Sequence, residues 1–192
     1  MASIAPSIAR TKSGLECAIR SATPADAEAV LDCARDVFAT SSYTLTQADE
    51  FTMTAEDERK FITDKLEADH ELFLLAVEGV GEKSTNGHAV GMLDLKHPTK
   101  RRKHRHTVLL GISVRSTHRG RGVGEALMRA AIDWAERDPT LELMTLEVYA
   151  ANATGLNLYH KLGFKEYGRL PAGCKHDDGT TWEQVMMVRP LK

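Results

Sequence analysis

Three glycines spaced two residues apart, Gly120, Gly122 and Gly124, separate a strand-like apolar run from a run with helical periodicity. Glycine lets the backbone turn tightly and bring its N–H groups against a ligand without a Cβ collision. A helix that starts here adds unpaired N–H groups and partial positive charge, and Arg119 and Arg121 flank the turn. The segment predicts a phosphate or pyrophosphate cradle; the alternative is a tight turn into a helix, with solvated arginines.

Two better-known glycine-rich motifs do not fit this segment. A P-loop needs Gly-Lys followed by Ser or Thr, whereas Gly124 is followed by Glu125. A dinucleotide fingerprint needs a glycine at its sixth position, which falls on Glu125 or Leu127. The pattern that remains is R-x-x-G-x-G.

Apolar periodicity along the rest of the chain predicts a single α+β domain. A flexible N-terminal tail is expected over residues 1–14 and the domain over 15–192. The order of elements predicts a mixed sheet flanked by helices, with a polar turn between Gly79 and Gly87. Strands are expected at 15–20, 72–78, 89–95, 108–114, 141–149, 166–175 and 182–188, and helices at 24–38, 55–69, 122–137 and 155–162.

Composition excludes several classes of protein. The 25 Lys and Arg nearly balance 27 Asp and Glu, which argues against a general nucleic-acid binder with a basic surface. The three cysteines form no C-x-x-C pair, so neither a zinc ribbon nor a disulfide framework is indicated, and we expect no metal. Without a signal-like segment or an apolar run of about 20 residues, the sequence predicts a cytoplasmic protein with no membrane partner.

A second motif follows the glycine turn by about 30 residues. It consists of the strand-like run Leu146–Asn152, then a short helical run containing Tyr159, then Gly163-Phe164. With both motifs the chain resembles the GNAT superfamily of acyl-CoA-dependent N-acetyltransferases. Around Glu147 and Tyr159 it is most similar to ribosomal-protein alanine acetyltransferases. The resemblance implies direct transfer of an acetyl group from acetyl-CoA to a primary amine in a ternary complex.

The resemblance also implies which residues bind the CoA. Strands 108–114 and 141–149, the fourth and fifth, would splay into a V, and Gly111 would allow a bulge. Asn152 would bond the pantetheine arm, and Asn157 and Lys161 would reach the CoA peripherally. Pantetheine would pair with the backbone of Ile112, Ser113 and Val114, and the pyrophosphate would rest on Arg119, Gly120, Arg121, Gly122, Val123 and Gly124.

Two residues carry the chemistry that the resemblance implies. Tyr159 would donate a proton or hydrogen bond to the departing thiolate; alternatively it is a tyrosine packed in the core. Glu147 would be the base that takes the amine proton; alternatively it pairs with an arginine. Asp94 is a second candidate base, and relatives that use water relays show that no side-chain base is required.

The acceptor is left open. Residues 39–54 carry Tyr43, Asp49, Glu50 and Phe51, which could receive a cationic amine. A small amine or amino acid, a polyamine and a protein N-terminus all remain open as acceptors. The basic run Lys100–His106 is either a solvated hairpin tip, an anchor for RNA or an acidic partner, or a contact to the CoA 3′-phosphate. It supports an alternative function, a catalytically silent module that binds through this loop. A homodimer through the C-terminal strands is common in the superfamily.

Overall fold

The sheet sets the architecture. The structure, a computed structural model, describes residues 3–79 and 87–192. Eight strands form one mixed sheet in the order β1-β2-β3-β4-β5-β6-β8-β7, in which β5 and β6 are parallel and the other neighbours antiparallel. The strands are β1 (Ser7–Arg10), β2 (Glu16–Ser21), β3 (Leu72–Glu78), β4 (His88–Lys96), β5 (Thr107–Val114), β6 (Leu143–Tyr149), β7 (Lys165–Lys175) and β8 (Thr181–Pro190).

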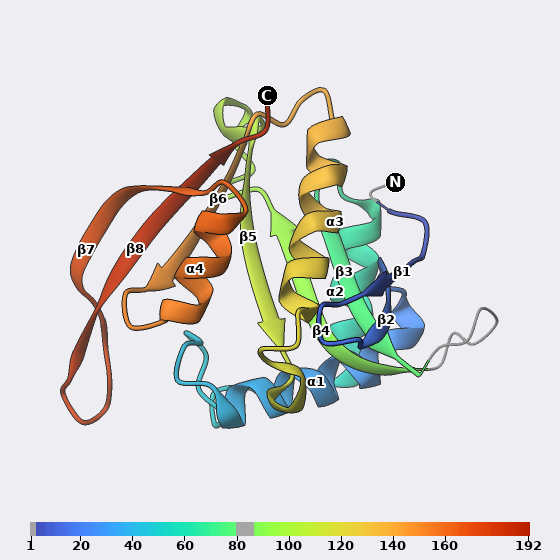
Figure 1. Ribbon diagram of the computed structural model, residues 1–192, viewed down its shortest axis with the longest axis horizontal. Helices are drawn as coiled ribbons and strands as arrows, with labels where there is room; N and C mark the ends of the chain where they lie inside the picture. The colour runs from blue at the N-terminus through green and yellow to red at the C-terminus, as the bar shows by residue number, and fades with distance from the viewer. Residues whose placement is uncertain (1–2, 80–86) are drawn as a thin grey trace.

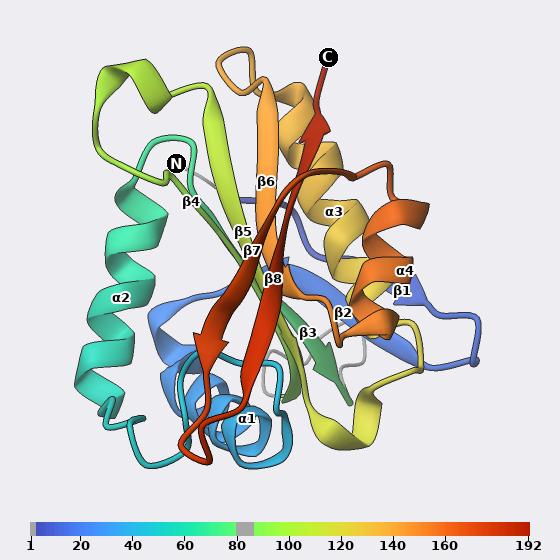
Figure 2. The ribbon, with the colours of Figure 1, turned by 90° about the vertical axis from the view of Figure 1, so that its left-hand side faces the viewer.

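Four α-helices cover the two faces of this sheet. Helices α1 (Ala27–Thr40) and α2 (Ala55–Glu67) lie on one side, and α3 (Val123–Arg137) and α4 (Ala153–Lys161) lie on the other (Figures 1 and 2). Local signals define their starts. Thr54 and Asp57 form a capping box before α2, the left-handed Gly122 precedes α3, and Asn152 caps α4.

The alternation of side chains along the strands gives each face its own core. Val123, Leu127 and Met128 of α3 pack with the β3–β6 side chains that point to their face. Val30 of α1 and Ile62 of α2 pack against the opposite face. The predicted single α+β domain with a mixed, mostly antiparallel sheet is confirmed. The predicted turn at Gly79–Gly87 falls largely outside the described residues.

The N-terminal segment differs from the predicted flexible tail. Residues Ser7–Arg10 form β1, which pairs antiparallel with β2 from Ser7 opposite Ile19 to Arg10 opposite Glu16. Gly14 has a φ of +81°, and Thr11 N–H donates to Leu15 O at 2.8 Å, so a tight turn joins the two strands. A four-residue edge strand with exposed side chains carries too little apolar alternation to be recognised in the sequence.

The parallel pair β5 and β6 opens along its length. Their pairing joins Thr107 to Leu143, Val108 to Met144 and Leu109 to Thr145, and it ends there. On its other side, β5 stays paired with β4 up to Val114. The predicted V-shaped splay between these two strands is therefore present. The bulge expected at Gly111 is absent, because the β4–β5 register is unbroken from Gly91 to Lys96.

Candidate active site

The glycine segment forms a turn at the open end of the splay, between β5 and α3. Gly120 and Gly122 have φ values of +71° and +93°, a region that glycine occupies without strain. The first intrahelical bond of α3 runs from Ala126 N–H to Gly122 O. The N–H groups of the first helical turn consequently have no partner within the helix. A Cβ on Gly120 would meet no atom within 4 Å, so the backbone is open to a ligand.

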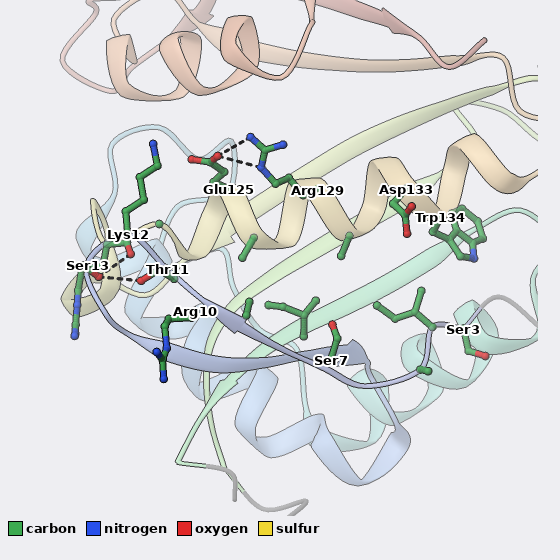
Figure 3. Close-up of a pocket in the computed structure, with 18 of the residues that line it drawn as sticks. Ser3, Ser7, Arg10, Thr11, Lys12, Ser13, Glu125, Arg129, Asp133 and Trp134 are labelled. Carbon is green, nitrogen blue, oxygen red and sulfur yellow. Dashed lines mark hydrogen bonds and ion pairs between the residues drawn. The ribbon is translucent and has the colours of Figure 1, made fainter. Parts of the chain in front are cut away.

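The N-terminal segment braces this turn. Ser13 Oγ donates to Arg121 O at 2.9 Å, and a Cβ on Gly122 would lie 3.0 Å from Thr11 Cβ. A groove of about 970 Å³ runs between this segment and α3. In Figure 3 the side chains of Lys12 and Glu125 lie on the same side of the N-terminal segment. Within residues 3–79 and 87–192, Lys12 and Arg121 make no ion pair. Two unpaired cations therefore flank the glycine turn.

Arg119 is engaged elsewhere. Its guanidinium donates to Val114 O at 3.0 Å, Thr40 O at 3.1 Å and Thr40 Oγ1 at 2.8 Å. These hydrogen bonds tie the end of α1 to the end of β5. Because the three acceptors are neutral, Arg119 still contributes a positive charge. A direct contact between its side chain and a pyrophosphate stays a prediction.

A cavity of about 1160 Å³ fills the splay. On the side facing β6, the backbone of Ile112, Ser113 and Val114 makes no ladder bonds beyond Leu109. Such an open strand edge can take an extended ligand as an additional strand. The Ile112 and Val114 side chains lie on the α3 side, about 3.7 and 3.6 Å from where a Gly124 Cβ would stand. The edge and the glycine turn together fit an extended ligand that ends in a diphosphate.

Tyr159 lies on α4 and lines this cavity. The residue is 8% exposed, its ring lies 6.0 Å from that of Phe164, and burial raises its pKa to about 12. Its hydroxyl makes no hydrogen bond to the described part of the chain. The ring packs in the core, as one of the two alternatives predicted, and the residue also borders the cavity; its role as a donor to the departing thiolate stays a prediction.

The asparagines and the lysine assigned to CoA separate into two groups. Asn152 lines the cavity; its Oδ1 accepts the Gly155 N–H at 2.9 Å, which leaves its NH₂ group free to donate. Asn157 and Lys161 are exposed and lie outside the cavity lining, and Lys161 pairs with Glu125. Their predicted contact with CoA is untested.

Glu147 projects from β6 onto the side of the sheet opposite to α3. The cavity lining includes both Glu147 and Tyr149, whereas Leu146 belongs to the core on the other face. Glu147 Oε2 accepts from Gln184 Nε2 at 2.6 Å, so its partner is a neutral amide and not an arginine. Tyr149, Tyr43 and His176 each place a ring within 6 Å of the Trp182 ring, which gives this side an aromatic wall.

Two more acidic residues line the cavity from the α2 side. Asp94 lies 2.6 Å from Lys65, which also bonds Glu71 at 2.8 Å; burial raises the pKa of Asp94 while Lys65 lowers it. Glu58, in the first turn of α2, is 5% exposed. Our sequence analysis missed Glu58, although its position three and four residues before Phe61 and Ile62 places it on the apolar face of the helix.

The basic run lies far from the glycine turn. It precedes β5, whereas the turn follows β5, and the two occupy opposite ends of that strand in Figure 1. Eight residues of extended chain span roughly 25 Å. The predicted alternative in which Lys100–His106 contacts the CoA 3′-phosphate is therefore wrong for a CoA bound at the turn. The run is exposed up to Arg105.

Comparison with known proteins identifies the family. The model of the acetyltransferase (GNAT) family matches residues 38–164, and the chain belongs to this family. A GNAT-family acetyltransferase structure from Streptococcus pneumoniae has a TM-score of 0.81 and 26% identity, over 90% of this chain and 98% of that one. A structure from Salmonella typhimurium with acetyl-CoA has a TM-score of 0.78 and 20% identity, over 92% and 94%.

Curated relatives match over shorter stretches. The N-alpha-acetyltransferase of Sulfurisphaera tokodaii is 37% identical over 83 residues, which are 43% of this chain and 47% of that protein. The chain spans between about a third and half of the length of the curated relatives that it matches. Among the described residues, no helix is long and apolar enough to cross a membrane, and no group of three or more His, Cys, Asp or Glu side chains is placed to hold a metal.

Proposed function

We propose that the protein is an N-acetyltransferase that moves an acetyl group from acetyl-CoA to a primary amine by direct attack in a ternary complex. The observation that carries the proposal is the cavity in the β5–β6 splay. One end of this cavity is the glycine turn with its unpaired N–H groups, one wall is the open edge of β5, and Tyr159 borders it. Membership of the acetyltransferase (GNAT) family supports the same activity.

The donor is held by the backbone in this proposal. The amides of Gly120 to Gly124 receive the pyrophosphate, assisted by the positive ends of Arg121 and α3. Ile112, Ser113 and Val114 pair with the pantetheine arm, and the free NH₂ group of Asn152 donates to it. Bound acetyl-CoA supplies an activated thioester carbonyl.

The amine attacks this carbonyl as a neutral nucleophile. The new N–C bond forms, the C–S bond breaks, the amine proton passes to a base, and the sulfur leaves with the electron pair. Glu147 takes the proton, either directly or through water, because Gln184 holds only one of its carboxylate oxygens. Asp94 is a weaker candidate, since Lys65 stabilises its charged form.

Tyr159 stabilises the departing sulfur. A phenol with a pKa of about 12 stays protonated at neutral pH and can donate. Full proton transfer to a thiolate whose conjugate acid has a pKa of about 8.5 is uphill by about 5 kcal/mol. Tyr159 therefore acts by hydrogen bonding to the sulfur in the transition state rather than by completing the transfer there.

Calorimetric titration with acetyl-CoA and with CoA, followed by a thiol-release assay over primary amines and peptide N-termini, tests the proposal. Micromolar binding of both nucleotides and amine-dependent thiol release are expected. A folded protein that binds neither would overturn it and favour the silent module that binds RNA or an acidic partner through Lys100–His106.

A homodimer through the C-terminal strands is part of the same proposal. β7 is the edge strand of the sheet, and its Tyr167 and Leu170 are 59% and 50% exposed. Exposed apolar side chains on an edge strand favour pairing with another chain. Light scattering on the wild type and on Leu170→Lys measures the mass; a dimer that the substitution dissociates is expected.

A further inference from the structure

Glu58 is a buried carboxyl without a partner. Its side chain makes no hydrogen bond or ion pair to the described residues, and its Oε1 is fully shielded from solvent. Burial raises its pKa to about 7, and no charged neighbour contributes to this shift. Burying a carboxylate without a partner is costly, so the position needs an explanation beyond packing.

The surroundings of Glu58 within the cavity are apolar. The lining near α1, α2 and the β3–β4 strands is formed by Val30, Ala34, Phe38, Phe61, Phe73 and Met92. Lys65 and Lys96, which lie on this side of the sheet, both act on the Asp94 carboxylate. No cation of the described chain neutralises Glu58.

Glu58 lines the cavity on the same side of the sheet as Glu147, which we call the acceptor side. Met92 stands opposite Ser113, and Asp94 stands opposite Gly111, so these residues share the face that carries Glu147. Ile112 and Val114 point to the other face, toward the glycine turn and α4. An acceptor approaching Ser113 from this side has Glu58 within the same cavity.

Glu58 is nevertheless remote from the reacting atoms. Helix α2 packs on β3, whereas the splay lies between β5 and β6. Neighbouring strands are about 4.8 Å apart, so β3 lies about 10 Å from β5. A charge held by Glu58 is separated from the attacking nitrogen by a short linker, and the apolar lining suits an alkyl chain.

We propose that Glu58 binds a second, non-reacting positive charge of the acceptor, which makes the substrate class an alkyl diamine or a similar dication with an apolar linker. The inference rests on the proposed acetyltransferase function. A diamine supplies the cation that the buried carboxylate lacks, and its methylene groups cover the phenylalanine side chains that line the cavity near Glu58. Its free amine is left at the β5 edge, facing the thioester.

The test compares the activity of four protein variants on three amines of similar chain length. Diaminopentane, pentylamine and aminohexanoate share a similar chain and differ in the group at the far end. Wild type, Glu58→Gln, Glu58→Asp and the control Glu56→Gln are assayed for kcat/KM. Glu56 lies on the same helix turn but is exposed. Binding of diaminopentane to the CoA-bound protein, measured by calorimetry, gives a readout independent of turnover.

The wild type is expected to prefer diaminopentane over pentylamine by 10-fold or more, the size of a charge-assisted contact. Glu58→Gln should lower kcat/KM for diaminopentane by about 10- to 100-fold, mainly through KM, and change pentylamine less than about 3-fold. Glu58→Asp should restore part of the preference. Glu56→Gln should behave as the wild type.

Three kinetic results overturn the inference while leaving the proposed function intact. These are equal use of diaminopentane and pentylamine, an equal effect of Glu58→Gln on both amines, and a preference for aminohexanoate, which would assign recognition to Lys96. Absence of diaminopentane binding to a protein that does bind CoA also overturns it. A protein that binds no acetyl-CoA fails at the earlier step, which removes the proposed function itself.

Discussion

Replacing Glu58 with glutamine should make the protein more stable at alkaline pH. The folded-state pKa of Glu58 is about 7 against an ordinary value of 4.5, because the carboxyl is buried without a partner. A raised pKa means that the folded state holds the proton more tightly than the unfolded chain does. Glu58 therefore costs no stability below about pH 4.5, and its cost grows as the pH rises, until it levels off above about pH 7.

The full cost follows from the size of the shift. A pKa of about 7 against 4.5 corresponds to roughly 3 kcal/mol, of which less than about 1 kcal/mol is present at pH 5 and nearly all at pH 8. Glutamine keeps the shape and removes the charge. The gain in unfolding free energy from Glu58→Gln should thus be larger at pH 8 than at pH 5 by roughly 2 to 3 kcal/mol.

Urea denaturation at the two pH values measures this difference. Any cost of burying the glutamine amide is common to both conditions and cancels in the comparison. Glu56→Gln, at an exposed position of the same helix, should show no such pH dependence. A Glu58→Gln effect that is the same at pH 5 and pH 8 would refute the reasoning, because it would mean that the carboxyl has no raised pKa.

Substitutions at four positions test the rest of the site. Aspartate and asparagine both tolerate the left-handed backbone at position 120 and differ only in charge, so calorimetry should show that Gly120→Asp binds acetyl-CoA at least 10-fold more weakly than Gly120→Asn. Equal affinities would mean that no phosphate binds at this turn. Tyr159→Phe removes a hydroxyl that makes no hydrogen bond to the described residues, so kcat should fall at least 10-fold with thermal stability and acetyl-CoA affinity unchanged. An unaltered kcat would exclude a catalytic role of the hydroxyl. Glu147→Gln should flatten the pH dependence of kcat/KM, whereas an unchanged profile would indicate bulk water as the base. Lys12→Ala should weaken acetyl-CoA binding about 2- to 5-fold, while the ion-paired Arg10 on the same segment serves as the alanine control that should have no effect.

The glycine turn and the short helix α4 could be predicted because their signals are local. The glycine spacing of residues 120–124 reports a backbone conformation, and φ values of +71° and +93° are found there. The asparagine before α4 is a cap, and Tyr159 follows it by seven residues on the same short helix. Each of these relations acts within a few residues, so a single sequence carries it.

The acceptor half depends on contacts between distant segments. Glu58 is buried only because α2 packs on β3 and α1, and nothing in its own neighbourhood distinguishes it from Glu56 except its phase on the helix. The brace of the glycine turn by Thr11 and Ser13 joins positions more than 100 residues apart. Tertiary contacts of this kind leave no periodic pattern, which is why the N-terminal strand was mistaken for a tail.

The proposed donor and acceptor halves of the site meet at the edge of β5. This arrangement allows the site to have a positive environment on one face of the sheet and a negative one on the other. Along β5, Ile112 and Val114 point to the α3 side, where the turn and Arg121 make the environment positive. Gly111 and Ser113 point to the side of Glu58, Asp94 and Glu147, where the environment is negative. In the proposed function the sheet would keep an anionic donor and a cationic acceptor on separate faces, and they would react through the β5–β6 splay. In this proposal acceptor specificity can change through α2 and the β7–β8 hairpin without disturbing the donor turn, whereas α1 is tied to that turn by the hydrogen bonds from Arg119 to Thr40.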